Sequence, residues 1–394
     1  MAASNVVKIL SDLVSRPSVN PMGRSVPHES PFFEGRVSDY LESFFRSLDV
    51  PFERRTISPG RDNLIAKFEP SDARHTLLWD AHQDTVPTEG MVIDPFRPSV
   101  EGGRVYGRGS CDVKGGMAAM LSAFARLVNN RPKGAARVIL ACTVDEEYTH
   151  TGSSALASQG LEVDLAIVAE PTMLEVVTAH KGAVRWKVLT EGVACHSSRP
   201  RDGINAIYRM AHVLTAIQNY SECLQESTPD PLLGPPTLSV GRIEGGQSVN
   251  VVPDTCSIDL DRRVIPGEDV DGVRQALRDA LHQALGDSIP FAFSEPWVRM
   301  PSLGPDRASS WVEPVREAIG TVLGQRPSIS AVPYGTDAGP LSASGIPSLV
   351  LGPGDIAQAH TKDEWIAVDQ LEQAVEVYYA IACHLGREGL TNAH

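Results

Sequence analysis

The stretch LLWDAHQDTVP, residues 77–87, joins an apolar run to a short polar segment. The apolar part lacks the strict alternation of a strand with one face in water, so it is typical of a strand that is buried on both faces of a parallel sheet. The run ends at His82 and Asp84. Taken alone, such a pair most often belongs to a structural histidine, so the rest of the chain has to show whether a site lies here.

Two further runs have the same character, RVILACTV (137–144) and LAIVA (165–169). Around them, helical periodicity predicts helices near 2–15, 33–48 and 115–129, and shorter apolar runs predict strands near 62–68 and 75–81. Later strands are expected in SISAVPY and PSLVLGP, and a closing helix over 369–386. This alternation predicts an α/β fold in which helices cover both faces of a mostly parallel sheet.

The pattern changes from about residue 181. An alternating strand, a helix, two strands, a helix near 268–285 and a strand near 290–298 follow one another, which is the β-α-β-β-α-β order of a small sandwich. We therefore expect two domains: a catalytic domain from 1–180 and 299–394, and an inserted smaller domain over 181–298.

Composition excludes several classes of function. The chain has 394 residues, too many for one ordinary core, and a formal net charge of −14. That charge argues against nucleic acid and anionic membranes as partners, because both are bound through Lys and Arg. The N-terminus lacks the pattern of a signal peptide, and the six cysteines are scattered without paired spacing, so we expect reduced thiols in a cytoplasmic protein.

Acidic and imidazole side chains follow the predicted strands of the α/β domain. Ligands bind at the carboxyl ends of the strands in such sheets, so these side chains are expected to meet at one edge. A Gly-rich loop, GRGSCDVKGG, brings one more carboxylate. The candidates are His82, Asp112, the run Asp145-Glu146-Glu147, Glu170 and His360.

Two histidines and three carboxylates suit zinc, and one shared carboxylate allows five ligands to hold two ions. Asp112 is the natural bridge. His82 and Glu170 would complete one metal site, and Glu147 and His360 the other. Each residue alone has a commoner structural explanation, but all of them follow strands of one sheet.

Three neighbouring carboxylates have expected roles beside the metals. In an extended segment Asp84 lies on the same side as His82, so it is predicted to orient the imidazole. Glu146 is the predicted general base that activates a metal-bound water and returns the proton to the leaving amine. Asp145 is the alternative base, although alternation would direct it with Glu147. The remaining histidines are expected to be structural or at the surface, with His180 left open: His28, His75, His150, His212, His282, His384 and His394.

Several segments together resemble one family of enzymes: AHQDTVP, GRGSCDVKGGMAAML, TVDEEYTHTGS, VAEPT, AHKG, CHSSRPRDGINAI and LGPGDIAQAHTKDEW. They look like the zinc-dependent acetylornithine deacetylase, succinyl-diaminopimelate desuccinylase and carboxypeptidase G family, with wording closest to acetylornithine deacetylase. The resemblance implies hydrolysis of an N-acyl amino acid on two Zn²⁺ per subunit, for which Co²⁺ or Mn²⁺ can substitute. Desuccinylase-like and dipeptidase or aminopeptidase activities are the alternatives.

The resemblance also implies roles for residues that spacing does not single out. The inserted domain resembles a dimerisation domain, and His196 resembles a histidine that reaches the partner subunit's site to stabilise an oxyanion. Asn250, Arg263 and Thr336 resemble residues that bind the substrate, although Arg263 could instead pair with Asp259 or Asp261. The peptide Asp112-Val113 matches a position that is cis in the family.

Overall fold

The computed structural model describes residues 5–27 and 31–386, and the chain forms two compact units. The first unit contains the described residues up to Thr178, then Gly304–Ala331 and the described residues from Thr336 onward. The second unit contains Ala179–Leu303 and Val332–Gly335. The N-terminal helix was expected from residue 2, and its first three residues lie outside the described part of the chain, as do His28 and His394.

The first unit is built on an eight-stranded sheet in the order β1-β2-β6-β3-β7-β17-β8-β16. The centre is parallel: β6, β3, β7 and β17 pair in that way, whereas β1, β2 and β8 pair antiparallel. The predicted α/β class is thus confirmed. The strands are β1 (Phe52–Ser58), β2 (Arg61–Phe68), β3 (Thr76–His82), β6 (Arg137–Thr143), β7 (Leu165–Val168), β8 (Val176–His180), β16 (Ile329–Val332) and β17 (Ser348–Val350).

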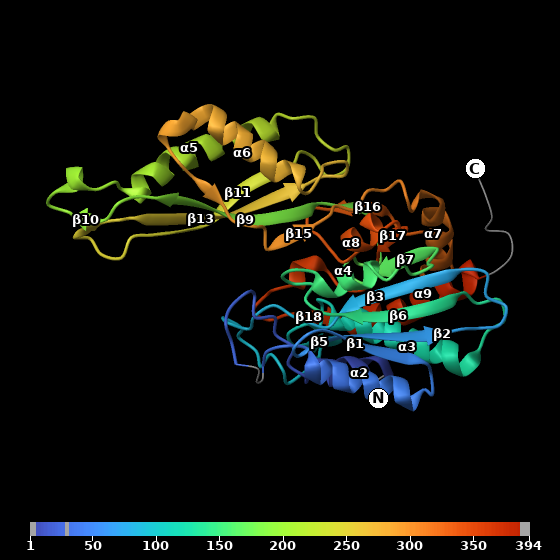
Figure 1. Ribbon diagram of the computed structural model, residues 1–394. Coiled ribbons are helices and arrows are strands. Elements are labelled where there is room, and N and C mark those ends of the chain that lie inside the picture. Colours follow the sequence, from blue (N-terminus) through green and yellow to red (C-terminus); the bar gives the residue numbers. More distant parts are fainter. Residues whose placement is uncertain (1–4, 28–30, 387–394) are drawn as a thin grey trace. The chain divides into compact units, whose positions relative to one another are not determined.

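Helices lie on both sides of this sheet (Figure 1). One core joins α1 (Asn5–Val14), α2 (Gly35–Ser47), α3 (Lys114–Asn130), α7 (Ser309–Leu323) and α9 (Val368–Leu385). Leu77, Trp79 and Ala81 of β3 belong to that core. The intervening side chains of β3 face the opposite side, where α4 (Thr151–Ala157) and α8 (Ala338–Ala343) pack together.

All seven residues of β3 are buried, as expected from the continuous apolar run. Asp80 and His82 fall on the α4 and α8 side, and His82 is the last residue of the strand. The strand therefore delivers an imidazole to the carboxyl edge of the sheet. A three-stranded sheet and a 3-10 helix complete the described part of this unit: β4 (Ser99–Glu101), β5 (Arg104–Tyr106), β18 (Trp365–Ala367) and η3 (Ile356–Gln358).

The second unit has the predicted β-α-β-β-α-β order. Its sheet runs β11-β13-β9-β14, with β15 also on β9, and its core lies between the sheet and two helices. Burial alternates along β13, as in a strand with one face toward solvent. The elements are β9 (Gly182–Glu191), β10 (Cys195–His196), η1 (Pro200–Asp202), α5 (Ala206–Gln225), β11 (Thr237–Gly245), β12 (Val251–Val252), β13 (Thr255–Val264), α6 (Gly272–Leu285), η2 (Gly286–Ser288), β14 (Ala292–Phe293) and β15 (Val298–Met300).

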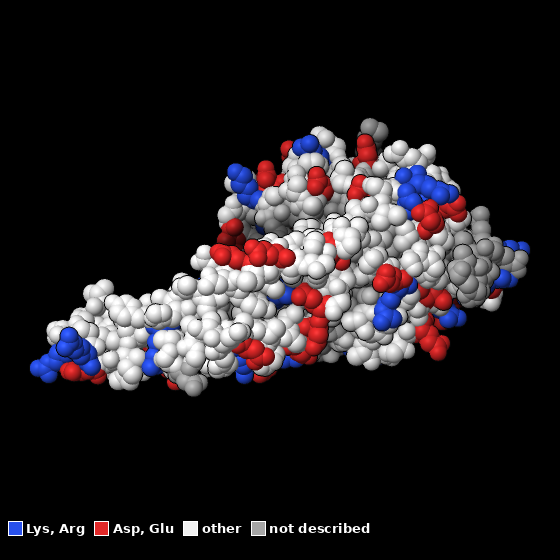
Figure 2. Space-filling model, turned by 90° about the horizontal axis from the view of Figure 1, so that it is seen from above, with Lys and Arg blue, Asp and Glu red and all other residues white. Residues whose placement is uncertain are grey.

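Charged side chains are spread over the surface. On the face seen in Figure 2, most of the basic groups lie next to acidic ones. Arg326, for example, pairs with Glu313 and Glu317. In the part of the chain that the structure describes, no helix is long and apolar enough to span a bilayer.

Candidate metal centre

The acidic and imidazole side chains predicted from the sequence meet at the carboxyl edge of the central strands. Three come from strand ends or the turns that follow β3, β6 and β7, one from the loop between β5 and α3, and one from the loop between η3 and β18. The peptide between Asp112 and Val113 is cis, as the resemblance implied. The side chains that the structure brings together are His82, Asp112, Glu147, Glu170 and His360.

These five residues form two groups that share Asp112. His82, Asp112 and Glu170 make one group, and Asp112, Glu147 and His360 the other, with ligand atoms within 4.8 Å of one another in each group. Asp112 Oδ1 lies 3.2 Å from His82 Nε2, and Asp112 Oδ2 lies 3.3 Å from His360 Nε2. Each oxygen of Asp112 thus serves one group, which is the arrangement of a bridging carboxylate.

The donor set fits a pair of divalent cations. Burial raises the pKa of Glu170 well above its ordinary value, and the charges of Asp112 and Glu147 raise it further. Hydrogen bonds to Asp112 and Glu147 raise the pKa of His360 to about 11. The carboxylates therefore repel one another and hold protons on the imidazole, and cations at this position would relieve that repulsion.

Glu364 holds the loop that carries Asp112. Its buried carboxylate accepts hydrogen bonds from the backbone N–H groups of Gly109, Cys111 and Asp112, at 2.8–3.0 Å, and from Arg108 Nη1 at 2.7 Å. Sequence reasoning missed this residue. Its only signal was a glutamate four positions after His360, and nothing in that spacing identifies a partner some 250 residues away in the chain.

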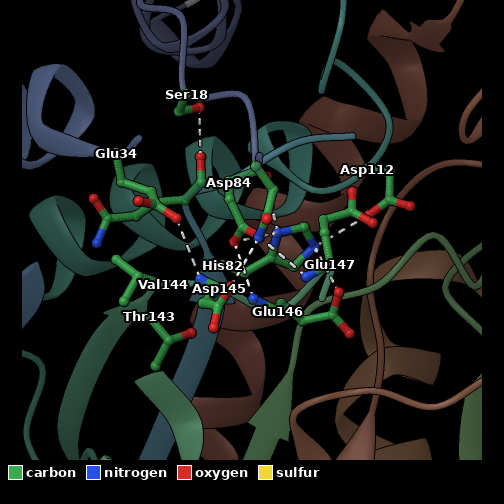
Figure 3. Close-up of polar contacts among 12 residues, drawn as sticks. Ser18, Glu34, His82, Asp84, Asp112, Thr143, Val144, Asp145, Glu146 and Glu147 are labelled. Carbon is green, nitrogen blue, oxygen red and sulfur yellow. Dashed lines mark hydrogen bonds and ion pairs between the residues drawn. The ribbon is translucent and has the colours of Figure 1, made fainter. Parts of the chain in front are cut away.

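Asp84 contacts both His82 and the turn after β6 (Figure 3). The ring nitrogen Nδ1 of His82 lies 3.0 Å from the carbonyl oxygen of Asp84 and 3.6 Å from its carboxylate. The expected contact is therefore made chiefly by the backbone. The carboxylate instead accepts the N–H groups of Glu146 and Glu147, both at 3.1 Å. Burial would raise the pKa of Asp84, but the neighbouring His82 and the hydrogen bond from Asn20 lower it to about 2.

Glu146, not Asp145, lies beside the cluster. The segment after β6 is a turn, so the alternation expected for an extended chain does not hold. Asp145 has a positive φ of 66°, and its carboxylate binds Asn20 at 2.9 Å and Arg61 at 2.8 Å. Glu146 Oε2 lies 4.0 Å from His82 Nε2. Burial raises the pKa of Glu146 well above its ordinary value, although His82 opposes the shift.

His150 was expected to be structural or at the surface, and it is in fact buried next to Glu146. Its Nδ1 lies 3.0 Å from Asp337 Oδ1 and 3.8 Å from Glu146 Oε1. Asp337 was not predicted either. The turn, which brings residues 146 and 150 to the same side, could not be foreseen from a segment that was expected to be extended.

The other candidates lie elsewhere. In the second unit, His196 is exposed and its Nδ1 lies 2.7 Å from Ser198 Oγ. Arg263 Nε donates to Asp261 Oδ1 at 2.7 Å, which is one of the two pairings left open. Asn250 is exposed in the same unit. These three residues thus differ from the buried cluster in their surroundings.

Thr336 is a buried residue of the first unit, and its hydroxyl accepts the N–H of Ala338 at 3.1 Å. His180, which the sequence left open, is the buried last residue of β8, a strand that begins in the first unit and ends in the second, and its Nδ1 lies 3.0 Å from the carbonyl of Lys181.

Comparison with known proteins agrees with this geometry. The model of peptidase family M20/M25/M40 matches residues 78–384. The chain belongs to this family. It is a metallohydrolase of the M20 class, and the resemblance found in the motifs is confirmed.

Individual relatives of this M20 chain are similar over most of its length. It is 32% identical over 347 residues to acetylornithine deacetylase from Aliivibrio salmonicida (strain LFI1238), covering 87% of this chain and 89% of that protein. A tripeptidase from Staphylococcus aureus shares the fold with a TM-score of 0.78 at 20% identity, over 98% of both chains. A dinuclear metal-binding M20 peptidase from Bacillus subtilis has a TM-score of 0.70 at 16% identity, over 96% of this chain and 97% of that one.

Proposed function

We propose that this M20 chain hydrolyses the amide bond of an N-acyl amino acid, in the manner of an acetylornithine deacetylase, with two metal ions in its site. The observation that carries the proposal is the pair of ligand groups joined by Asp112. The relatives at about 30% identity that are named acetylornithine deacetylase support the substrate class. The neighbour described as a dinuclear metal-binding peptidase supports the number of metals.

Zinc is the metal that we assign, with cobalt or manganese as substitutes. His82 and Glu170 would hold one ion, Glu147 and His360 the other, and Asp112 would bridge them, because mixed imidazole and carboxylate sets of this size suit zinc. When bound, the ions supply Lewis acidity toward the acyl carbonyl and toward water.

Glu146 is the general base in this proposal. Its carboxylate lies within 4.0 Å of His82, and its backbone N–H is bound to Asp84, which holds the turn in place. Glu146 takes a proton from the attacking water and gives it to the leaving amine. A raised pKa suits that exchange, because the group must be able to carry the proton between the two steps.

The second unit supplies the remaining groups of the proposal. We assign 181–298 as the inserted dimerisation and lid domain between the catalytic parts 1–180 and 299–394. His196 acts in the partner subunit's site, where its ring donates to the oxyanion of the tetrahedral intermediate. Arg263 and Asn250 of this unit bind the substrate carboxylate, together with Thr336 of the first unit. Exposed apolar side chains on the second unit, such as Tyr208 and Val249, favour a homodimer.

The proposed location is the cytoplasm. No disulfide joins any of the six cysteines, all of which lie in the described part of the chain, and this supports a reducing compartment.

The alternative activities use the same metal pair on a desuccinylase substrate or a free peptide. A dipeptidase or aminopeptidase needs acidic groups for the free amine of its substrate, whereas a deacylase does not. The purified protein loaded with zinc should be assayed on N-acetyl amino acids, N-succinyl amino acids and free dipeptides. Preference for N-acetyl substrates is expected, and preference for free dipeptides would replace the proposal with the alternative.

Glu146→Gln tests the chemical role. The amide keeps the shape of the side chain but cannot take a proton, so we expect turnover to fall by roughly a thousandfold or more while both metals remain bound. Wild-type turnover with two metals bound would refute the assignment of the base. A matched control is Asp363→Asn, since Asp363 is an exposed carboxylate beside Glu364.

A further inference from the structure

A third group of potential ligands lies directly beside the two that share Asp112. Glu146, His150 and Asp337 are all buried, and their ligand atoms lie within 4.8 Å of one another. Neither of the two metal assignments above uses His150 or Asp337. The base of the proposed reaction is therefore also a member of a separate imidazole and carboxylate set.

The distances in this third group are close to those of a coordination shell. His150 Nδ1 is 3.0 Å from Asp337 Oδ1 and 3.8 Å from Glu146 Oε1. Ligands about 2.1 Å from a tetrahedral zinc ion lie about 3.4 Å apart. The two distances fall on either side of that value, and the remaining pair of ligand atoms, of Glu146 and Asp337, lies within 4.8 Å.

The carboxylate of Glu146 is available for such a role. Its side chain is 10% exposed, and it lies 4.0 Å from His82 Nε2 and 3.8 Å from His150 Nδ1. Both distances are longer than a hydrogen bond. A cation at this position would neutralise part of the negative charge of this buried carboxylate.

The surroundings of the group also favour a cation. Thr143 Oγ1 lies 2.9 Å from Asp80 Oδ1 and 3.0 Å from Asp337 Oδ2, so a single hydroxyl proton lies between two buried carboxylates. Ser153 donates a further hydrogen bond to Asp337. In the described part of the chain, neither Asp80 nor Asp337 pairs with a lysine or an arginine.

We propose that Glu146, His150 and Asp337 form a third, weaker site for a divalent transition metal, and that filling it inhibits the enzyme. A metal held there engages the Glu146 carboxylate as a ligand, so Glu146 no longer accepts the proton of water. Metal in excess of the two catalytic ions therefore switches off turnover while the catalytic pair stays in place. This inference rests on the proposed function, because it takes Glu146 as the base.

The test is a zinc titration of the purified protein that already holds two equivalents, with bound zinc measured by equilibrium dialysis and turnover measured in parallel. The wild type is expected to bind a third equivalent more weakly than the first two and to lose turnover over the same range of zinc concentration. His150→Gln and Asp337→Asn should each weaken the third equivalent and the inhibition by about tenfold or more, since each removes one of three ligands.

His212→Gln is the matched control, because His212 is an exposed histidine on α5 of the second unit and should leave the third equivalent unchanged. Each variant is compared with its own turnover at two equivalents. If one variant fails to fold, the other carries the test. Binding of only two equivalents by the wild type, or unchanged inhibition in the folded variant, would overturn the inference. Failure of the proposed function would give a different result. The wild type would then bind fewer than two equivalents of zinc tightly, or would show no turnover with two equivalents bound.

Discussion

The two units of the chain place their polar side chains in opposite surroundings. In the first unit, Asp112 is buried and each of its oxygens faces a different imidazole. In the second unit, His196 is exposed and Arg263 pairs with Asp261 on its own strand. The first arrangement is complete within the fold of one unit. The second shows no such arrangement in the described residues, and we assign its residues to substrate and partner.

The largest effect is expected from removing Asp112, the carboxylate that the two ligand groups of the first unit share. Asp112→Ala deletes the one carboxylate that both ligand groups share, so we expect loss of both metals and a fall in turnover of about ten-thousandfold or more. Metal content per subunit and turnover should be measured together. Glu101→Ala removes an exposed carboxylate at the end of β4 and serves as control. Two metals retained in Asp112→Ala would show that the groups do not depend on the bridge.

The second prediction concerns the exposed histidine. His196→Ala should lower turnover by roughly a hundredfold to a thousandfold, which is the usual cost of one oxyanion donor, and should leave both metals bound. Mixing this variant with Glu146→Gln gives hybrid dimers in which one site has both an intact base and an intact partner histidine. Because half of the dimers are hybrids and half of their sites work, about a quarter of wild-type turnover should return.

No recovery in mixtures whose subunits are shown to exchange would place His196 outside the partner's site. Loss of metal from His196→Ala would likewise contradict a role restricted to the oxyanion.

Continuous apolar runs made much of the first unit predictable. Strands buried on both faces have no polar alternation, so LLWDAH, RVILACTV and LAIVA predicted the parallel centre and the edge at which His82 and Glu170 lie. The antiparallel β1 was not predicted, because FERRTIS is mostly charged or polar and lies at the edge of the sheet. Local pattern thus identified the central strands β3, β6 and β7 but missed β1 at the edge and the buried β8.

Contacts made by turns and by distant segments were beyond that pattern. The positive φ of Asp145 turns the chain so that Glu146 and His150 face the same side, and no periodicity predicts such a residue. Glu364 reaches the loop of Asp112 from far along the chain, a contact that only tertiary structure makes. The residues that meet in the cluster were therefore predictable from strand ends and short motifs, whereas the contacts that Glu364 and His150 make with them were not.

A substitution at Glu364 tests how the buried cluster of the first unit is held in place. Glu364→Gln replaces one acceptor oxygen with an amide N–H that faces backbone N–H groups, so the loop of Asp112 should loosen. We expect metal affinity to fall by about tenfold to a hundredfold, with turnover largely recovered at saturating metal. Competition with a chelator measures the affinity, and Asp363→Asn is the control next to it in the chain. If the metal affinity of Glu364→Gln were unchanged, Glu364 would stabilise the fold without positioning Asp112 for metal binding.

The smallest expected effect concerns Glu34, a buried carboxylate of the first unit that is not among the proposed metal ligands. Burial raises the pKa of Glu34 well above its ordinary value, and the charges of Asp84 and Asp145 add to the shift that Arg61 opposes. The folded state therefore binds a proton at Glu34 more tightly than the unfolded chain does. Stability from this group is greatest below the unfolded pKa and falls as the pH rises toward the folded pKa.

Glu34→Gln removes this titration, so the unfolding free energy of the wild type should fall relative to that of the variant as the pH rises above the ordinary pKa of a glutamate. Urea unfolding of both metal-loaded proteins measures the difference, in which the contribution of the metals cancels. Glu53→Gln, an exposed carboxylate of β1, should show no such slope. A pH-independent difference for Glu34→Gln would mean that Arg61 compensates the burial of Glu34 in full, so that a buried carboxylate of this unit needs no metal to remain charged.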